Sequence, residues 1–183
     1  MSARLPALAD DGGAKHLQRG RRMPSLELPA TNGARVNFAT LAGRVVLYCY
    51  PWTGRPGMPN PPDWDDIPGA HGSTPEAEGF RNLHDGFGAL NATVYGLSTQ
   101  PTTYQQELVE RLGLPFALVS DAQFALARAL ALPTFETGGV TYLKRLTLGL
   151  EDGRIDRVYY PVTLPAAHAR EVCAWLGMIH RSQ

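Results

Sequence analysis

The sequence has little cysteine, no net charge and no long apolar run, and each of these absences excludes a class of protein. Two cysteines in 183 residues, Cys49 and Cys173, are too few for a disulfide framework, so a reducing cytoplasm is the expected compartment. Seventeen basic and seventeen acidic side chains cancel, which disfavours general nucleic-acid binding, because such binding depends on neutralising phosphates. No apolar stretch approaches the roughly 18 residues of a membrane span. We therefore expect a soluble cytoplasmic protein without nucleic-acid or membrane partners.

The first 24 residues differ in character from the rest of the chain. They lack the apolar stretch of a secretory signal. They contain several glycines and a basic cluster made of Lys15, His16, Arg19, Arg21 and Arg22. Such a cluster favours a solvated tail over a contact with an acidic partner. The sequence thus predicts a flexible arm over residues 1–24 and a single domain over residues 25–183.

The rest of the chain alternates strands and helices. The continuous apolar run at 45–50 is typical of a strand buried on both faces, as in a parallel sheet. Asn-Gly at 32–33 predicts an N-terminal hairpin, and Asp-Gly at 152–153 predicts a second one between strands at 143–150 and 155–160. Further strands are expected at 94–98 and 116–120, and helices at 74–88, 102–113, 124–130 and 166–180. This order predicts an α/β fold, a mixed sheet with helices on both faces.

A stretch rich in proline and glycine, residues 51–72, separates the buried strand from the next helix. Its composition argues against a regular element, and a loop of this length in a compact domain is usually functional or disordered. Trp52 and Trp64 favour partial packing over disorder. The loop brings a helix N-terminus to the end of a parallel strand, which is where open α/β sheets bind ligands.

Ser73-Thr74-Pro75-Glu76 starts that helix and is the most informative tetrapeptide of the chain. It fits a capping box, in which Ser73 accepts from the backbone N–H of Glu76 and the Glu76 side chain reaches back. Its place after the loop also makes it a candidate anion site, because helix N-termini favour anions. A serine-hydrolase nucleophile is disfavoured: the glycine-flanked elbow is absent, and no acid is evidently placed to orient His71.

The other reactive side chains give weaker signals. The five histidines have no ligand spacing, so neither a metal nor a cofactor is expected. Cys49 falls in a core strand and Cys173 on the apolar stripe of the last helix, where cysteine usually acts as a small hydrophobe. Lys144 and Arg145 interrupt an apolar strand, and alternation sends their side chains to opposite faces. The spacing leaves open whether one of them points towards the loop or into solvent.

Taken together, these segments resemble the peroxiredoxins, in particular the bacterioferritin comigratory protein group of the alkyl hydroperoxide reductase superfamily. The resemblance covers roughly residues 24–177. It depends on the order and spacing of Tyr50-Pro51, Pro68 to Arg81, Val94 to Ser98, Leu114 to Asp121 and Lys144 to Leu148. It implies a thioredoxin-like fold in which the long loop, with Pro51, Pro68 and Gly72, is the active-site loop.

In peroxiredoxins, the first turn after this loop carries the peroxidatic cysteine in the pattern Gly-Cys-Thr-Pro. A helix N-terminus and a nearby arginine lower the pKa of its thiol, and the thiolate attacks a hydroperoxide and becomes a sulfenic acid. A second cysteine often resolves that product. By resemblance, Ser73 stands at the peroxidatic position beside Thr74, Glu78 at the resolving position and Arg145 at the arginine position. Ala70 stands where many peroxiredoxins have threonine.

The sulfurs of both the peroxidatic and the resolving cysteine are therefore missing. Two such replacements favour natural loss of the cysteines over a single engineered substitution. The leading interpretation is a peroxiredoxin-family protein that cannot run the thiol peroxidase cycle. It would keep a crevice for a hydroperoxide or small anion at Ser73 and Arg145. One alternative is an active peroxidase that uses Cys49 or Cys173 with a thioredoxin-type reductant. Another is a non-enzymatic interaction module that forms a homodimer through the loop between Trp52 and Trp64.

Overall fold

The computed structural model describes residues 8–181 and shows the α/β fold predicted from the sequence. The strands are β1 (Leu28–Pro29), β2 (Arg35–Val36), β3 (Arg44–Cys49), β4 (Ala92–Ser98), β5 (Leu118–Ser120), β6 (Thr134–Thr137), β7 (Val140–Leu143), β8 (Leu146–Glu151) and β9 (Arg154–Tyr159). The helices are α1 (Ser73–Asn82), α2 (His84–Ala89), α3 (Thr102–Leu112), α4 (Ala125–Leu130) and α5 (Pro165–Arg181), and a 3-10 turn, η1, spans Trp64–Asp66. The helix expected over 74–88 is divided at Leu83 into α1 and α2, and two glycines lower the helix propensity of α2.

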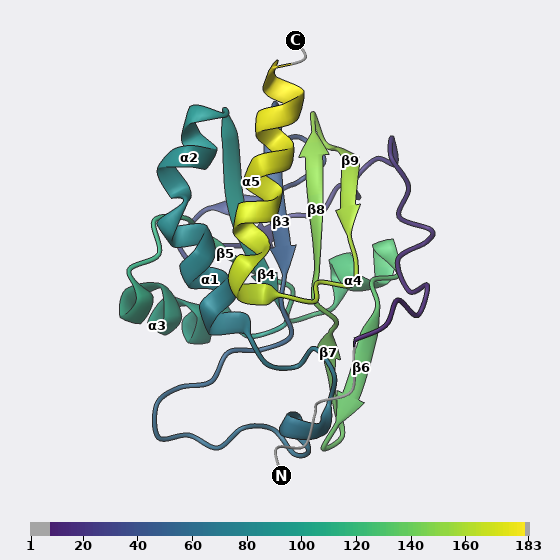
Figure 1. The fold of residues 1–183 in the computed structure, drawn as a ribbon. Coiled ribbons are helices and arrows are strands. Elements are labelled where there is room, and N and C mark those ends of the chain that lie inside the picture. Colours follow the sequence, from purple (N-terminus) through teal and green to yellow (C-terminus); the bar gives the residue numbers. More distant parts are fainter. Residues whose placement is uncertain (1–7, 182–183) are drawn as a thin grey trace.

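A five-stranded mixed sheet forms the centre of the domain, in the order β5-β4-β3-β8-β9 (Figure 1). Strands β3, β4 and β5 run parallel, whereas β8 is antiparallel to both β3 and β9. The small hairpin β1–β2 reaches the outer strand β5 through a bridge between Ala30 and Val119. All six residues of β3 are buried, as expected for a strand covered on both faces.

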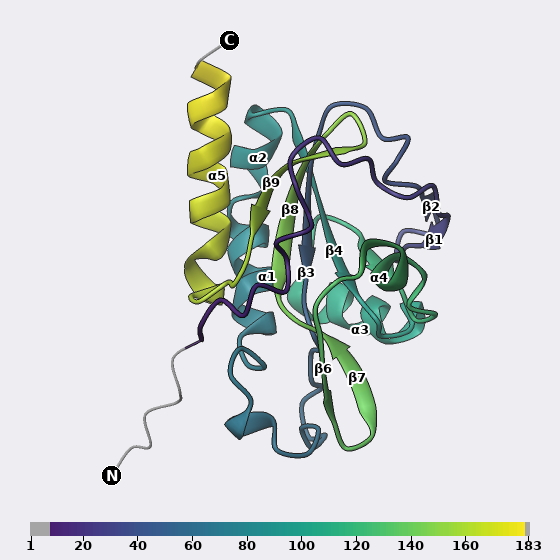
Figure 2. The same cartoon turned by 90° about the vertical axis from the view of Figure 1, so that its right-hand side faces the viewer.

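The two faces of the sheet are covered by different layers (Figure 2). Val45, Leu47 and Cys49 pack against a cluster that includes the N-terminal segment, the β1–β2 hairpin and α4. Val46 and Tyr48 point the other way, into a cluster with α1, α2 and α5. This period of two along β3 follows from strand geometry and accounts for the continuous apolar run in the sequence.

Residues 8–24 are packed against the domain, which corrects the flexible arm predicted from the sequence. Leu17 and Met23 are buried in the core. The backbone N–H groups of Gly20 and Met23 donate to carbonyl oxygens of β9 and the β8–β9 turn, at 2.7 and 2.9 Å. The prediction rested on the basic side chains, whereas the apolar side chains between them are what pack against the domain. Residues 1–7, the rest of the predicted arm, lie outside the described residues.

The loop over residues 51–72 lies at the carboxyl ends of β3 and β4, next to the β6–β7 hairpin (Figure 1). Trp64 is only 3% exposed. Its ring lies 5.4 Å from that of Trp52, and 5.7 and 5.2 Å from those of Phe135 and Tyr142 on the hairpin. The packing that the two tryptophans predicted is therefore present, and the hairpin supplies the surface for it.

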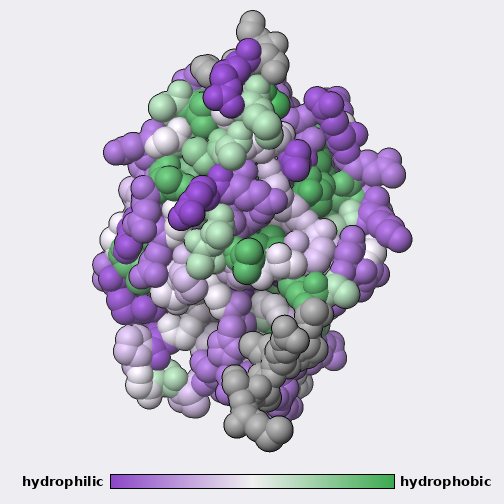
Figure 3. Space-filling model, in the orientation of Figure 1, coloured by the Kyte–Doolittle hydropathy of each residue, from purple (hydrophilic) through white to green (hydrophobic). Residues whose placement is uncertain are grey.

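The exterior is mixed in polarity. On the face shown in Figure 3, hydrophobic side chains form small groups between hydrophilic ones. Large exposed hydrophobic side chains are found at Met58, Val140, Leu164 and Met178. Across residues 8–181, no helix is long and apolar enough to cross a membrane.

Candidate functional site

Helix α1 begins at Ser73, directly after a turn that requires glycine. Gly72 has a φ of +108°, which side chains rarely adopt. A Cβ at this position would also lie 2.7 Å from Cγ of Pro165, at the start of α5. The turn thus fixes α1 closely against α5 and leaves the Ser73 side chain 5% exposed at the end of the loop.

Arg145, just before β8, reaches the same place from the sheet. Its guanidinium is buried, and its Nη2 donates to Ser73 Oγ at 3.0 Å. The same nitrogen lies 3.4, 3.3 and 3.1 Å from the carbonyl oxygens of residues 69, 70 and 71. Of the two adjacent cations in the sequence, Arg145 is therefore the one that faces the loop, while Lys144 pairs with Asp11.

Glu76 is the counter-ion of Arg145. Its carboxylate is fully buried and forms an ion pair with Nη1 of Arg145. Its backbone N–H donates to the carbonyl of Gly72 at 3.0 Å, not to Ser73. The capping box predicted from the sequence is thus wrong, because a guanidinium is a stronger partner for the carboxylate than a backbone N–H.

The net charge of the Arg145–Glu76 pair beside Ser73 depends on whether Glu76 is protonated. Burial raises the pKa of Glu76 to about 7, although the guanidinium of Arg145 acts in the opposite direction. Two buried atoms of the pair, Glu76 Oε1 and Arg145 Nε, have no hydrogen-bond partner among the described residues. Protonation of Glu76 would leave the positive charge of Arg145 uncompensated next to the Ser73 hydroxyl.

A crevice of about 360 Å³ opens beside Ser73, between the long loop and the first turn of α1. Thr74 and Ala70 line it, as does His71. His71 Nε2 lies 2.6 Å from a carboxylate oxygen of Asp65, so an acid does orient this histidine, contrary to the expectation from the sequence. Ser73 itself bonds to Arg145, not to His71. Among residues 8–181, no group of three or more His, Cys, Asp or Glu side chains is placed to hold a metal ion.

The remaining predicted site residues lie outside this crevice. Pro51 is buried immediately after β3. Pro68 lines a separate cavity that Arg145 also lines. Glu78 is half-buried further along α1 and is not part of the crevice lining. The structure thus places Ser73 and Thr74 in the crevice lining, with Arg145 bonded to Ser73 from outside that lining, and it leaves Glu78 out.

The two cysteines differ in their surroundings. Cys49 is fully buried in β3, and burial raises the pKa of its thiol well above the usual range. Cys173, expected in the core, is instead only partly buried on α5, and burial raises its thiol pKa too. It lies eight residues after Pro165, which is about 12 Å along the helix axis from the turn at Gly72. Neither thiol lines the Ser73 crevice.

These features define a class of protein. A parallel β3–β4 pair ends at the N-terminus of a helix, and an arginine next to a later antiparallel strand reaches the first residue of that helix. This is a thioredoxin-like fold, with a serine in the first turn of that helix. Residues 18–171 match the Redoxin family model. The chain therefore belongs to the redoxin family, among the peroxiredoxins.

Individual relatives agree with this assignment. Peroxiredoxin Bcp of Bacillus subtilis is 31% identical over 114 residues, which cover 62% of this chain and 63% of that protein. A second curated relative, from Coxiella burnetii, is 30% identical over 60% of its own length. The chain thus spans about 60% of the length of these two curated relatives.

Two solved structures extend the likeness to nearly the whole fold. The crystal structure of peroxidoxin BcpB from Mycobacterium tuberculosis has a TM-score of 0.73 at 27% identity and covers 90% of this chain and 99% of that one. The bacterioferritin comigratory protein of Xanthomonas campestris has a TM-score of 0.71 at 25% identity, with coverages of 89% and 99%.

Proposed function

We propose that this chain is a peroxiredoxin-family protein that binds a small anion or hydroperoxide at Ser73 but does not reduce it through a thiol cycle. The observation that carries the proposal is the hydrogen bond from Arg145 to a serine hydroxyl at the start of α1. The structures of the Xanthomonas campestris relative concern alkyl peroxide reduction activity. By that relationship, the ligand expected at this site is a peroxide or a molecule of similar size and polarity.

The chemistry of the side chain supports the loss of activity. A cysteine at a helix N-terminus beside a cation has a thiol pKa below the free value of about 8.5, and its thiolate is the nucleophile. A serine hydroxyl in the same place stays protonated at neutral pH and does not enter the oxidation series of cysteine. Arg145 and the unpaired N–H groups of the first turn can still hold oxygen atoms. Binding is therefore retained in the proposal, whereas the redox step is not.

The two native cysteines do not replace the missing thiol. Cys49 is closed off by the core, and Cys173 lies about 12 Å along α5 from the turn that holds Ser73. A raised thiol pKa disfavours the thiolate at both positions. A thioredoxin-type reductant would thus have no oxidised cysteine at the crevice to reduce.

The direct test is peroxide consumption. The full chain should not remove hydrogen peroxide or an alkyl hydroperoxide faster than a protein-free control, with dithiothreitol or with thioredoxin, its reductase and NADPH. The Cys49→Ser/Cys173→Ser double variant should behave identically. Turnover by the unaltered chain that disappears in Cys173→Ser would overturn the proposal in favour of a peroxidase with a relocated cysteine.

A gain of function tests the binding half of the proposal. Ser73→Cys should produce a thiol whose pKa lies below about 8.5 and which reacts with hydroperoxide faster than free cysteine. Because Glu78 stands at the resolving position, the product should remain a sulfenic acid that a probe can trap. Thr74→Cys is the matched control, since it puts a thiol on the same helical turn without the contact to Arg145. Equal reactivity of the two variants would show that the crevice no longer activates a ligand at position 73.

A further inference from the structure

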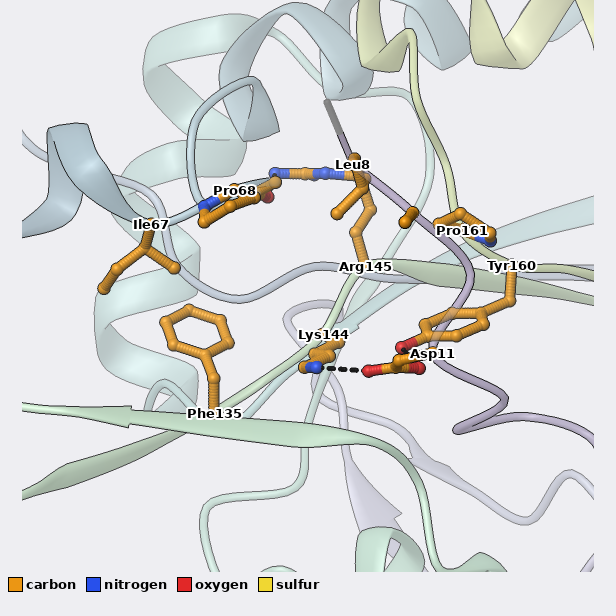
Figure 4. A pocket seen from close by; sticks show the side chains of 11 residues that line it. Leu8, Asp11, Ile67, Pro68, Phe135, Lys144, Arg145, Tyr160 and Pro161 are labelled. Atoms are coloured by element: carbon orange, nitrogen blue, oxygen red, sulfur yellow. Dashed lines mark hydrogen bonds and ion pairs between the residues drawn. The ribbon is translucent and has the colours of Figure 1, made fainter. Parts of the chain in front are cut away.

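A second cavity, of about 340 Å³, lies beside Arg145 and is distinct from the Ser73 crevice (Figure 4). Its walls come from segments far apart in the sequence: the N-terminal segment from Leu8 to Asp11, the loop at 67–69, Phe135 of β6, and the connection from β9 to α5 at 160–161. Its volume is at the lower end of the range for small-molecule sites. The N-terminal segment supplies one of these walls because it packs against the domain.

The lining is divided by polarity. Figure 4 shows Ile67 and Phe135 on one side of the cavity and Lys144, Asp11 and Tyr160 on the other. Sites for small molecules generally combine mostly apolar walls with a few convergent polar groups. A ligand that fits this division has an apolar body and one polar end.

The polar end already holds a carboxylate, which belongs to the chain itself. Lys144 Nζ lies 2.6 Å from Oδ2 of Asp11, and the Tyr160 hydroxyl donates to its Oδ1 at 2.6 Å. These two bonds, with one from the backbone N–H of Gly13, lower the pKa of the Asp11 carboxyl well below its usual range. The side chains of Lys144 and Asp11 are 35% and 44% exposed, so this pair can open without unfolding the core. Lys144 and Tyr160 therefore form a carboxylate-binding pair whose present occupant is tethered and partly exposed.

We propose that the cavity binds a monocarboxylate with an apolar body, and that its carboxylate replaces Asp11 on Lys144 and Tyr160. At about 30 Å³ for each atom, the volume that a water molecule takes in the liquid, the cavity holds roughly ten non-hydrogen atoms. The apolar body lies against Ile67 and Phe135. The cavity lining contains two cations, Lys144 and Arg145, and the guanidinium of Arg145 is paired with Glu76. Once Asp11 leaves, Lys144 is the lining cation without a counter-ion, so the site matches a single monoanion.

Asp11 acts in this proposal as a built-in competitor. A tethered group competes at an effective concentration in the millimolar range, so it weakens the apparent affinity for a free carboxylate. Removing its charge frees both partners and raises the affinity. The proposal does not involve the hydroxyl of Ser73, so it stands or falls separately from the proposed function.

The test is calorimetric titration of the full chain with octanoate, which has ten non-hydrogen atoms. Asp11→Asn should bind octanoate roughly tenfold more tightly than the unaltered chain. Adding Lys144→Met to that variant should remove the gain. Asp10→Asn is the matched control for charge, because this neighbouring carboxylate accepts from the backbone N–H of Gly12 and does not line the cavity. Its gain in affinity should be much smaller than that of Asp11→Asn. Octanol, with the same body and no carboxylate, should bind at least about tenfold more weakly than octanoate.

A steric variant keeps the test decisive if the charge variants disturb the N-terminal segment. Ile67→Trp, made with Asp11 intact and again with Asp11→Asn, fills the apolar side and should abolish octanoate binding while thermal melts remain cooperative. The proposal is overturned if Asp11→Asn shows no saturable octanoate binding, if Asp10→Asn gains as much, or if Ile67→Trp binds as well as its parent.

Discussion

At the scale of single residues, the pair of Arg145 and Glu76 governs the site. The guanidinium contacts a hydroxyl, a carboxylate and a row of loop carbonyl oxygens, and all of these groups lie at the end of β3. Both members of the pair are buried, and truncating one partner of a buried ion pair usually costs more than the pair contributes. Conservative replacement is therefore the informative way to probe it.

Glu76→Gln should change how stability depends on pH. The pKa of Glu76 is raised to about 7 in the folded chain, above the value of about 4.3 for an unfolded glutamate. The stability that this group contributes is thus fully present below about pH 4.3 and is lost as the pH rises through 7, with a slope of up to about 1.4 kcal/mol per pH unit. Urea denaturation from pH 4 to 8 should show this component in the unaltered chain and not in Glu76→Gln. Glu78→Gln, on the same helix but outside the pair, should retain it; parallel curves for all three proteins would contradict the prediction.

The cysteines allow a second prediction at this scale. In the native protein, iodoacetamide should modify Cys173, which is partly exposed, and leave Cys49 unmodified in the core of β3. Modification of Cys49 should begin only when denaturant unfolds the chain. Mass spectrometry of tryptic peptides distinguishes the two sites, and equal labelling of both thiols in the native state would show that β3 opens readily.

The sequence identified some of these residues and missed others for physical reasons. Resemblance placed Ser73 and Arg145 at one site, and their side chains are indeed within hydrogen-bond distance. The ion pair of Glu76 was not found, because a capping box and a buried counter-ion place the same residue type at the same position. The carboxylate contact of Asp11 was also not found, because it joins residues 133 positions apart in the sequence.

At the scale of elements, the β6–β7 hairpin was absent from the prediction although a signal for it exists. Gly138 and Gly139 both have positive φ at its tip, and a Gly-Gly pair between short β-forming stretches is a known hairpin pattern. The hairpin matters because Phe135 and Tyr142 support Trp64, and through it the long loop. The position of the long loop therefore depends on this aromatic contact.

Trp64→Ala should release the loop without unfolding the sheet. The ring is almost completely buried between the loop and the hairpin, and removing a buried tryptophan costs about 3–5 kcal/mol where its cavity cannot collapse. We expect much faster cleavage within the loop by endoproteinase Asp-N, which cuts before Asp65 and Asp66, with little change in far-ultraviolet circular dichroism. Trp52→Ala removes a half-buried ring from the same contact and should have a smaller effect. Unchanged cleavage in Trp64→Ala would mean that other contacts hold the loop.

At the scale of the whole molecule, the sequence predicted the mixed sheet and its two covering layers because strand periodicity and turn residues are local signals. It failed for residues 8–24, whose packing depends on the distant strand β9 and has no periodic pattern. The domain is consequently larger than the sequence indicated, since part of one covering layer comes from the N-terminal segment.

Leu17→Ala tests whether the N-terminal segment contributes to global stability. Leu17 is 3% exposed within the core cluster, so truncation should lower the free energy of unfolding by about 2–5 kcal/mol. Lys15→Ala, two residues earlier and exposed, should stay within about 0.5 kcal/mol of the unaltered chain. Guanidinium denaturation measures both free energies of unfolding. An unchanged value for Leu17→Ala would indicate that the N-terminal segment is a free arm.

The position of the segments that precede β3 also bears on how copies of this chain can meet. The N-terminal segment bonds to the start of β9, at Arg154 and Ile155, and the β1–β2 hairpin bridges to β5, so both outer strands of the sheet are partly covered. Unpaired outer strands are templates for strand addition, domain exchange and amyloid-like stacking. Here residues 20–31 of the same chain hinder those routes at both edges of the sheet. This partial cover favours a homodimer through helix or loop faces over one through strand addition. A truncation that removed residues 8–24 should expose the start of β9 and favour aggregation.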